Sequence, residues 1–316
     1  YNLLKKHNMK NRDNFIPWIY HPDYDIPLPT NHRFTAKKHA DLLSLLMKSE
    51  ISNNSRVFQP EPANKDQIQI VHTKSYINKI EFGNLSKSEE NILGLPWSKE
   101  LLKRAYLDVN GTLTAAKLAL KHAIACHLAG GTHHAHANFG SGFCVFNDIA
   151  FTAKNLIHEC ICKKVLVIDC DVHQGDGTAS ICSDEPAIYT CSMHAKNNFP
   201  LEKINGDYDI PLDDEISNKE YMNKIIYMLD ICNKEISPDL VIYDAGVDVH
   251  QNDKLGRLKI NSETIMKRDL AILDYFKQKS IPICTVIGGG YSEDRNELAK
   301  RHSIIFNAAH RVYCAS

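Results

Sequence analysis

Two polar segments between Gly130 and Gly177 carry side chains that could bind a metal ion and move a proton. The first is Gly130-Gly-Thr-His-His134. The second is Asp169-Cys-Asp-Val-His-Gln-Gly-Asp-Gly177, which begins where an apolar run ends. Aspartate and histidine are ligands of divalent cations. Histidine is also a suitable base, because its unperturbed pKa of about 6.5 lies near neutrality. The pattern therefore indicates a hydrolytic site.

The candidate metal ligands are Asp171, His173 and Asp248. One imidazole and two carboxylates leave positions open for water and substrate, as a catalytic zinc requires. Such an oxygen-rich set also tolerates other divalent ions. The alternative is that the Asp-x-His pair caps a helix and that Asp248 makes a bond within a turn.

The candidate bases are His133 and His134, which follow a Gly-Gly turn. Each imidazole needs a partner that fixes its tautomer, and Asp169 and Asp176 are available from the next strand end. A pair of histidines in a surface turn is the alternative. We interpret two further histidines as bystanders: His127 and His136.

A tyrosine, Tyr291, follows three glycines directly after another apolar run. This turn could point the phenol into the site, where its hydroxyl would stabilise a carbonyl oxygen that becomes an oxyanion. Alternatively, the glycines form the loop before a helix and the tyrosine is a packing residue.

Short apolar runs alternate with helical patterns from about residue 100 onward. This alternation predicts an α/β fold with a mostly parallel central sheet and helices on both faces. Ligands of such sheets bind beyond the carboxyl ends of the strands. Each polar motif here follows an apolar run, so the motifs are expected at that end of the sheet. The expected strands are 124–128, 165–169, 188–193, 240–243 and 283–287, and the expected helices are 99–122, 145–158, 218–236, 262–279 and 294–312.

The composition is that of an ordinary soluble domain. The chain has 316 residues, 43% of them hydrophobic, and a formal net charge of −1. No global basic charge indicates nucleic acid, and no apolar run is long enough to span a membrane. We expect a poorly ordered lead-in at 1–14, a single domain at 15–316, reduced cysteines and a cytoplasmic location.

These motifs resemble those of the zinc-dependent histone deacetylase family, which has the arginase/deacetylase fold. The resemblance runs from about His21 to Val312. It is carried by the two segments above together with Ser141-Gly-Phe-Cys-Val-Phe-Asn-Asp148, Asp244-Ala-Gly-Val-Asp248 and Gly288-Gly-Gly-Tyr291.

The resemblance implies a role for each site residue. The zinc ligands would be Asp171, His173 and Asp248, one ion per chain. His134 would be the general base and His133 its electrostatic partner, paired with Asp176 and Asp169 respectively, while Tyr291 would polarise the acyl carbonyl. The substrate channel would involve Gly142, Phe143, Phe199, Leu255 and Gly289, and a structural potassium ion would bind at Asp169, Asp171, His173, Ser192 and Met193.

The family implies removal of acetyl or longer acyl groups from lysine side chains of proteins or peptides. Gln174 and the segment 253–258 look more like class IV and bacterial members than class I. An acetylpolyamine deacetylase on the same fold is the nearest alternative, and Asp23, Asp25, Glu61 and Glu202 could attract its cationic substrate. An arginase-like binuclear manganese enzyme would want a carboxylate where His250 stands. A non-catalytic acyl-lysine binding protein is the alternative of another class.

Overall fold

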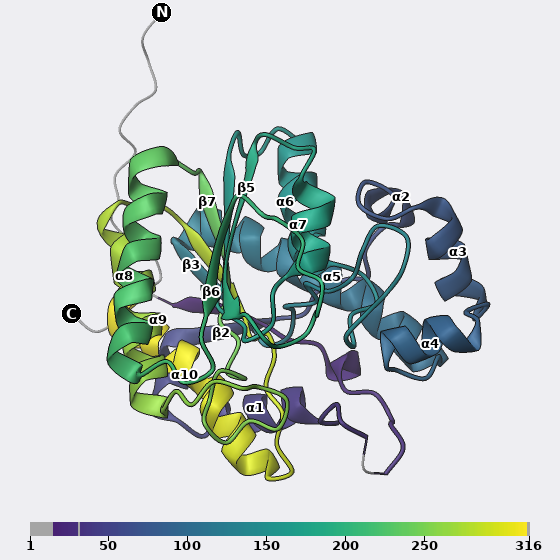
Figure 1. Ribbon diagram of the computed structural model, residues 1–316, viewed down its shortest axis with the longest axis horizontal. Coiled ribbons are helices and arrows are strands. Elements are labelled where there is room, and N and C mark those ends of the chain that lie inside the picture. Colours follow the sequence, from purple (N-terminus) through teal and green to yellow (C-terminus); the bar gives the residue numbers. More distant parts are fainter. Residues whose placement is uncertain (1–14, 31, 315–316) are drawn as a thin grey trace, which may run out of the picture.

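In the part of the chain that the structure describes, eight strands form one parallel sheet at the centre of the protein (Figure 1). The computed structural model describes residues 15–30 and 32–314, so the lead-in expected at 1–14 lies outside the described residues. The α/β prediction is confirmed, and all five expected strands are present. In spatial order the strands are β2 (Ser55–Phe58), β1 (Ile16–Ile19), β3 (Ile124–His127), β8 (Ile283–Val286), β7 (Leu240–Asp244), β4 (Val165–Asp169), β5 (Ile188–Ala195) and β6 (Tyr208–Leu212).

Three strands were not predicted, and all three lie in the outer part of the sheet. Strands β1 and β6 contain Pro17 and Pro211, which have no N–H for the strand ladder and therefore weaken the sequence signal. Strand β2 is a short edge strand whose side chains are half-buried or exposed. The central strands β3, β4, β7 and β8 are buried throughout, which explains their continuous apolar sequences.

Helices cover both faces of the sheet. Helices α1, α8, α9 and α10 lie on one side and α5, α6 and α7 on the other, while α2, α3 and α4 extend beyond α5 (Figure 1). Two separate groups of buried apolar side chains fill the two faces. The helices are α1 (Lys38–Met47), α2 (Lys65–Ile68), α3 (Lys74–Phe82), α4 (Lys87–Leu93), α5 (Lys99–His122), α6 (Asp148–His158), α7 (Asp176–Cys182), α8 (Asn218–Glu235), α9 (Ser262–Gln278) and α10 (Arg295–Tyr313).

The helix boundaries follow from capping side chains. Ser98 accepts a hydrogen bond from the N–H of Leu101 at the start of α5, and Asn261 caps α9 in the same way. Ser217 and Glu220 form a capping box at α8, in which each side chain satisfies a backbone N–H of the first turn. These polar residues preceding apolar patterns are the signals that place the helices correctly in the sequence.

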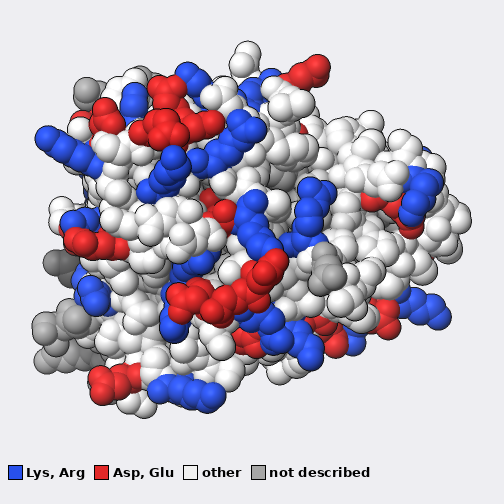
Figure 2. Space-filling view, turned by 60° about the horizontal axis from the view of Figure 1, so that its bottom comes forward, with Lys and Arg blue, Asp and Glu red and all other residues white. Residues whose placement is uncertain are grey.

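Basic and acidic side chains lie side by side on the face shown in Figure 2, in keeping with a net charge close to zero. None of the helices in the described part of the chain is long and apolar enough to cross a membrane.

Candidate active site

The three predicted metal ligands lie together beyond the carboxyl ends of β4 and β7. Nδ1 of His173 lies 3.0 Å from Oδ1 of Asp171 and 3.1 Å from Oδ2 of Asp248. All three residues are buried, and their ligand atoms lie within 4.8 Å of one another. An arrangement of two carboxylates and one imidazole around a common point fits a divalent cation with open positions.

Backbone N–H groups fix the orientation of these carboxylates. Gly289 donates to Oδ2 of Asp171 at 2.7 Å, and Val172 donates to Oδ1 of Asp248 at 2.8 Å. Burial opposes protonation of His173, but the two carboxylates outweigh it and raise the pKa of His173 to about 10. The cluster therefore attracts positive charge, which a bound cation would supply.

Each histidine of the pair is held by its own carboxylate. Nδ1 of His133 lies 2.7 Å from Oδ2 of Asp169, and Nδ1 of His134 lies 2.6 Å from Oδ1 of Asp176. Both predicted partnerships are therefore present. The interpretation of His136 as a bystander is wrong, because its Nε2 lies 3.0 Å from the other oxygen of Asp176. Sequence spacing gave no sign that one carboxylate serves two imidazoles.

The two adjacent imidazoles differ in charge. Burial disfavours the charged form of His133, yet Asp169 and Asp171 overcome it and raise the pKa of His133 well above its usual range. For His134, burial and the neighbouring charge of His133 lower the pKa to about 4, despite the opposing effect of Asp176. Near neutrality, His133 is thus the charged member of the pair and His134 is the neutral one that can accept a proton.

Tyr291 lies in the same cavity as both histidines and the metal cluster. Its side chain is only 9% exposed, and its backbone N–H donates to Asp253 at 2.7 Å. Burial raises the pKa of the phenol well above 10, so the hydroxyl keeps its proton and can donate it in a hydrogen bond. The sequence alternative of a purely packing tyrosine does not account for its position beside the metal cluster.

A cavity of about 420 Å³ leads from this cluster to the surface. Phe143 and Phe199 form its walls, and Leu255 lies at its rim. The centroid of the Phe199 ring lies 4.9 Å from that of His134, and the centroid of the Phe143 ring lies 5.8 Å from that of Tyr291. Gly142 has a positive φ of 54°, and a side chain there would lie 2.6 Å from the His134 ring. These four residues are brought together as predicted.

The mouth of this channel is not acidic. Among the described residues that line it, none is aspartate or glutamate, whereas Arg33 is present. Asp25 instead bonds to His39 at 2.7 Å, and Asp23 pairs with Lys103 at 2.5 Å. None of the four carboxylates considered for attracting a cationic substrate lines the channel, and attraction of a cationic substrate by them stays a prediction.

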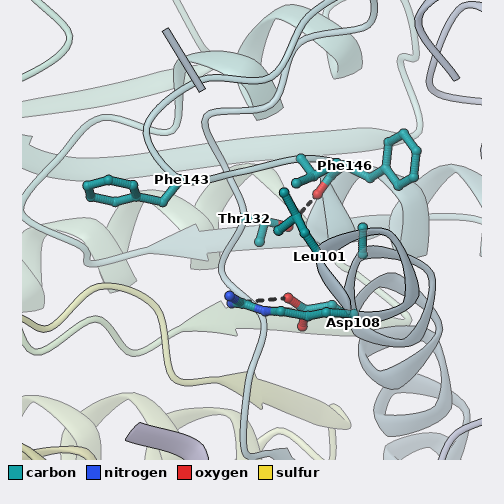
Figure 3. A pocket seen from close by; sticks show the side chains of 8 residues that line it. Leu101, Asp108, Thr132, Phe143 and Phe146 are labelled. Carbon is teal, nitrogen blue, oxygen red and sulfur yellow. Dashed lines mark hydrogen bonds and ion pairs between the residues drawn. The ribbon is translucent and has the colours of Figure 1, made fainter. Parts of the chain in front are cut away.

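At its inner end, the site meets a buried ion pair that the sequence analysis missed. Lys38 and Arg104 line the inner cavity together with the catalytic candidates. Nη2 of Arg104 lies 3.9 Å from Oδ2 of Asp108, one turn further along α5 (Figure 3). The spacing of four residues was the available signal, but it is ordinary for exposed helical pairs and did not indicate burial.

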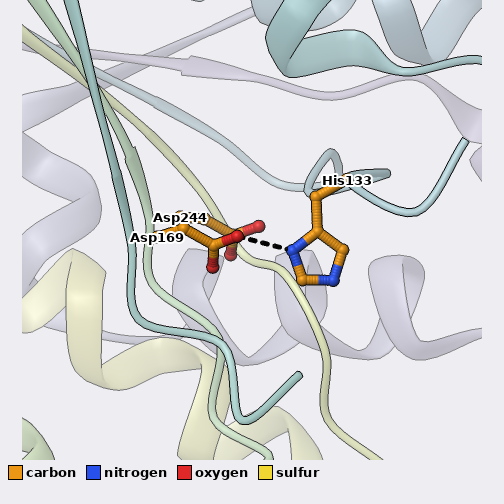
Figure 4. Close-up of side chains that lie close together, drawn as sticks. All are labelled: His133, Asp169 and Asp244. Atoms are coloured by element: carbon orange, nitrogen blue, oxygen red, sulfur yellow. Dashed lines mark hydrogen bonds and ion pairs between the residues drawn. The ribbon is translucent and has the colours of Figure 1, made fainter. Parts of the chain in front are cut away.

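A further buried carboxylate, Asp244, lies beside the His133–Asp169 pair (Figure 4). Asp169 and Asp244 are register partners on neighbouring strands, so their side chains project from the same face. Neither carboxylate oxygen of Asp244 has a hydrogen-bond partner among the described residues. Burial and the nearby Asp169 raise the pKa of Asp244 well above its usual range.

For the remaining candidates, no contact defines a role at the metal cluster. The hydroxyl of Ser192 lies 3.0 Å from Nδ1 of His194, and Met193 is buried on the same strand. Potassium binding therefore stays a prediction.

His127 bonds to Thr112 and Tyr24, away from the metal cluster. His250 bonds to Ser262 and accepts from the N–H of Asn252, so it does not complete a second metal shell.

Comparison with known proteins identifies the family. The histone deacetylase domain matches residues 32–307, and the chain therefore belongs to the histone deacetylase family. It is 38% identical over 298 residues to an uncharacterized protein of Picosynechococcus sp., covering 94% of this chain and 99% of the relative.

Two further relatives have functional names. Histone deacetylase 2 of Arabidopsis thaliana is 27% identical, covering 86% of this chain and 74% of the relative. The acetoin utilization protein AcuC of Staphylococcus aureus is 29% identical, covering 72% of this chain and 64% of the relative. Membership of this family supports hydrolysis of amides by the site described above.

Proposed function

We propose that the protein is a zinc-dependent amidohydrolase that removes acyl groups from lysine side chains of peptides or proteins. The observation that carries this proposal is the convergence on one cavity of a buried Asp-His-Asp cluster, two histidine–carboxylate pairs and Tyr291. Asp171, His173 and Asp248 would hold the zinc. When bound, zinc supplies Lewis-acid polarisation of a carbonyl and acidifies a water molecule.

The side chains divide the proton transfers between them. Neutral His134, oriented by Asp176, accepts the proton of the attacking water. Charged His133 stabilises the negative charge that develops in the transition state, and the phenol of Tyr291 donates to the forming oxyanion. A histidine then protonates the departing lysine amine. The products are a free lysine side chain and a carboxylic acid.

A lysine side chain is a better match to the channel than a polyamine. Phe143 and Phe199 present aromatic walls to the methylene chain of lysine. A polyamine keeps positive charges beyond the amide, and these would meet Arg33 at a mouth without lining carboxylates. We therefore propose a peptide substrate, with acetylpolyamine deacetylation as the alternative that an experiment must exclude.

The test compares hydrolysis of an acetyl-lysine peptide with that of acetylspermidine by zinc-loaded protein. We expect kcat/KM for the peptide to exceed that for acetylspermidine by at least about tenfold, the ratio that 1.4 kcal/mol of discrimination produces. Metal analysis should find one zinc per chain, and Asp171→Ala should lose it. Bound zinc without hydrolysis of any amide would instead support an acyl-lysine binding protein.

A further inference from the structure

A small chamber lies behind the catalytic residues, at the inner end of the substrate channel. Its volume is about 30 Å³, and His134 and Tyr291 line it together with Lys38 and Arg104. A smaller cavity of about 10 Å³ continues past Arg104 to Asp108. An acyl group held for hydrolysis at the metal cluster would therefore point its far end towards these charged side chains.

Arg104 is a buried guanidinium with incomplete hydrogen bonding. The residue is only 6% exposed, and its Nη1 has no hydrogen-bond partner among the described residues. The face of the group packs over the Phe34 ring at 4.7 Å. A buried guanidinium with an unpaired N–H is costly to desolvate, so the arrangement favours a ligand that accepts this hydrogen bond.

Lys38 adds a second buried cation to the same chamber. It is also 6% exposed, and its Nζ donates to the carbonyl oxygen of Gly288 at 3.2 Å. A neutral carbonyl oxygen is only partial compensation for a buried ammonium group. Burial and the charge of Arg104 lower the pKa of Lys38 to about 8, which still leaves it protonated at neutral pH.

The carboxylates nearest to Arg104 and Lys38 do not fully neutralise them. Asp108 lies 3.9 Å from Arg104, and its other oxygen accepts from the N–H of Gly130. Burial raises the pKa of Asp108 to about 6, so this carboxylate is still mostly ionised at neutral pH, but it lies too far from Arg104 to accept a hydrogen bond. Both carboxylate oxygens of Asp148 already accept hydrogen bonds from backbone N–H groups, one from Gly131 and one from Thr132. Asp171 and Asp248 also act on Lys38, but they belong to the metal cluster.

We propose that this chamber is a carboxylate subsite, and that the protein hydrolyses lysines whose short acyl group ends in a carboxylate, such as succinyl-lysine. This inference rests on the proposed amidohydrolase function and extends it to the acyl group. A carboxylate would accept hydrogen bonds from Arg104 and Lys38 in a site shielded from water, where charge-assisted bonds are strong. A long alkyl chain would instead meet two charged groups in a chamber of about 30 Å³.

The reaction is an ordinary hydrolysis and needs no further reactant. Water adds to the amide carbon, the bond between that carbon and the lysine nitrogen breaks, and the nitrogen takes a proton. Succinyl-lysine thus yields lysine and succinate. The distal carboxylate is unchanged and serves only to hold the acyl group.

The experiment uses one peptide with its lysine acetylated, succinylated, or modified with the terminal primary amide of the succinyl group. The amide has nearly the same shape as succinyl but no charge, so the ratio of the two kcat/KM values isolates the carboxylate. We expect kcat/KM for the succinyl peptide to exceed kcat/KM for the amide peptide by tenfold or more. In Arg104→Gln the ratio should fall towards one, whereas Arg311→Gln, an exposed arginine on α10, should keep it.

The outcomes are distinguishable. Equal rates for succinyl and amide in a protein that cleaves acetyl-lysine would overturn the subsite and leave the proposed function intact. Failure to cleave all three peptides would reject the proposed function itself. Inhibition by free acetate that Arg104→Gln removes, without a preference for succinyl, would assign the chamber to the free acid and also overturn the proposal. If Arg104→Gln does not fold, Lys38→Met provides the same comparison.

Discussion

At the scale of single residues, burial and neighbours give chemically identical side chains different functions. His133 and His134 are adjacent in the chain, and the centroids of their rings are 4.1 Å apart. Carboxylates around His133 hold it charged, and that charge helps to keep His134 neutral. This is the environment-driven separation of pKa values by which an enzyme obtains an acid and a base from similar groups.

The dependence of His134 on its partner can be tested with Asp176→Asn. An asparagine keeps the shape of the side chain but loses the charge that orients the imidazoles of His134 and His136. We expect kcat on an acetyl-lysine peptide to fall by about 10- to 100-fold, as losses of supporting carboxylates do. The control is Asp274→Asn on α9, outside the site, which should leave kcat unchanged. Unaltered kcat in Asp176→Asn would remove the carboxylate from the mechanism.

The role of Tyr291 is separable from metal binding. Tyr291→Phe removes one hydroxyl from a buried ring and leaves the Asp-His-Asp cluster untouched. We expect kcat to fall by roughly 10²- to 10³-fold, as for loss of an oxyanion donor, with zinc content unchanged. Tyr227→Phe, at a tyrosine that is 55% exposed, is the matched control. Near-normal turnover by Tyr291→Phe would contradict the assignment.

At the scale of elements, the sequence predicts what repeats along the chain and misses what only the folded chain brings together. Helix 99–122 and strand 165–169 are found with the predicted ends, because Ser98 caps the helix and a continuous apolar run marks the strand. The metal ligands and histidine partners are also predictable, since they follow neighbouring strands at one sheet edge. Arg104 and Asp108 were missed because only tertiary packing distinguishes a buried ion pair from an exposed one.

The loop after β8 can be tested through its first glycine. Gly288 has a φ of 56°, and a β-carbon there would lie 2.0 Å from Oδ1 of Asp244. We expect Gly288→Ala to destabilise the protein by more than about 2 kcal/mol, because backbone strain and the clash with a buried side chain add. Gly83→Ala is the matched control: its φ is 67°, but its nearest contact is the Trp97 ring at 3.0 Å. Equal denaturation midpoints for the two variants would show that the clash near Asp244 is relieved without cost.

At the scale of the whole molecule, the fold keeps several imidazoles neutral in its interior. Burial lowers the pKa values of His39, His72 and His194 to about 4. In the unfolded chain these groups titrate near 6.5. Below that pH the unfolded state binds more protons than the folded state, so folding stability falls as the pH decreases from 6.5 towards 4.

His72 offers the clearest case, because its hydrogen bonds require the neutral ring. The backbone N–H of Asn147 donates to Nε2 at 2.9 Å, and Nδ1 donates to the carbonyl oxygen of His136 at 2.9 Å. Protonation would place a second N–H against that of Asn147. Over a full shift from 6.5 to about 4, His72 contributes on the order of 3 kcal/mol to the loss of stability.

Urea denaturation at pH 7 and pH 4.5 measures this contribution. The free energy of unfolding of the wild-type protein should fall from pH 7 to pH 4.5. The variant His72→Gln should be less stable at pH 7, but its free energy of unfolding should fall by a smaller amount. The pH-dependent difference between the two proteins belongs to His72 alone, since all other titrating groups are common to both. His158→Gln, which replaces an exposed histidine on α6, should follow the wild-type curve. Parallel curves for wild type and His72→Gln would mean that the protonated imidazole is accommodated in the folded protein.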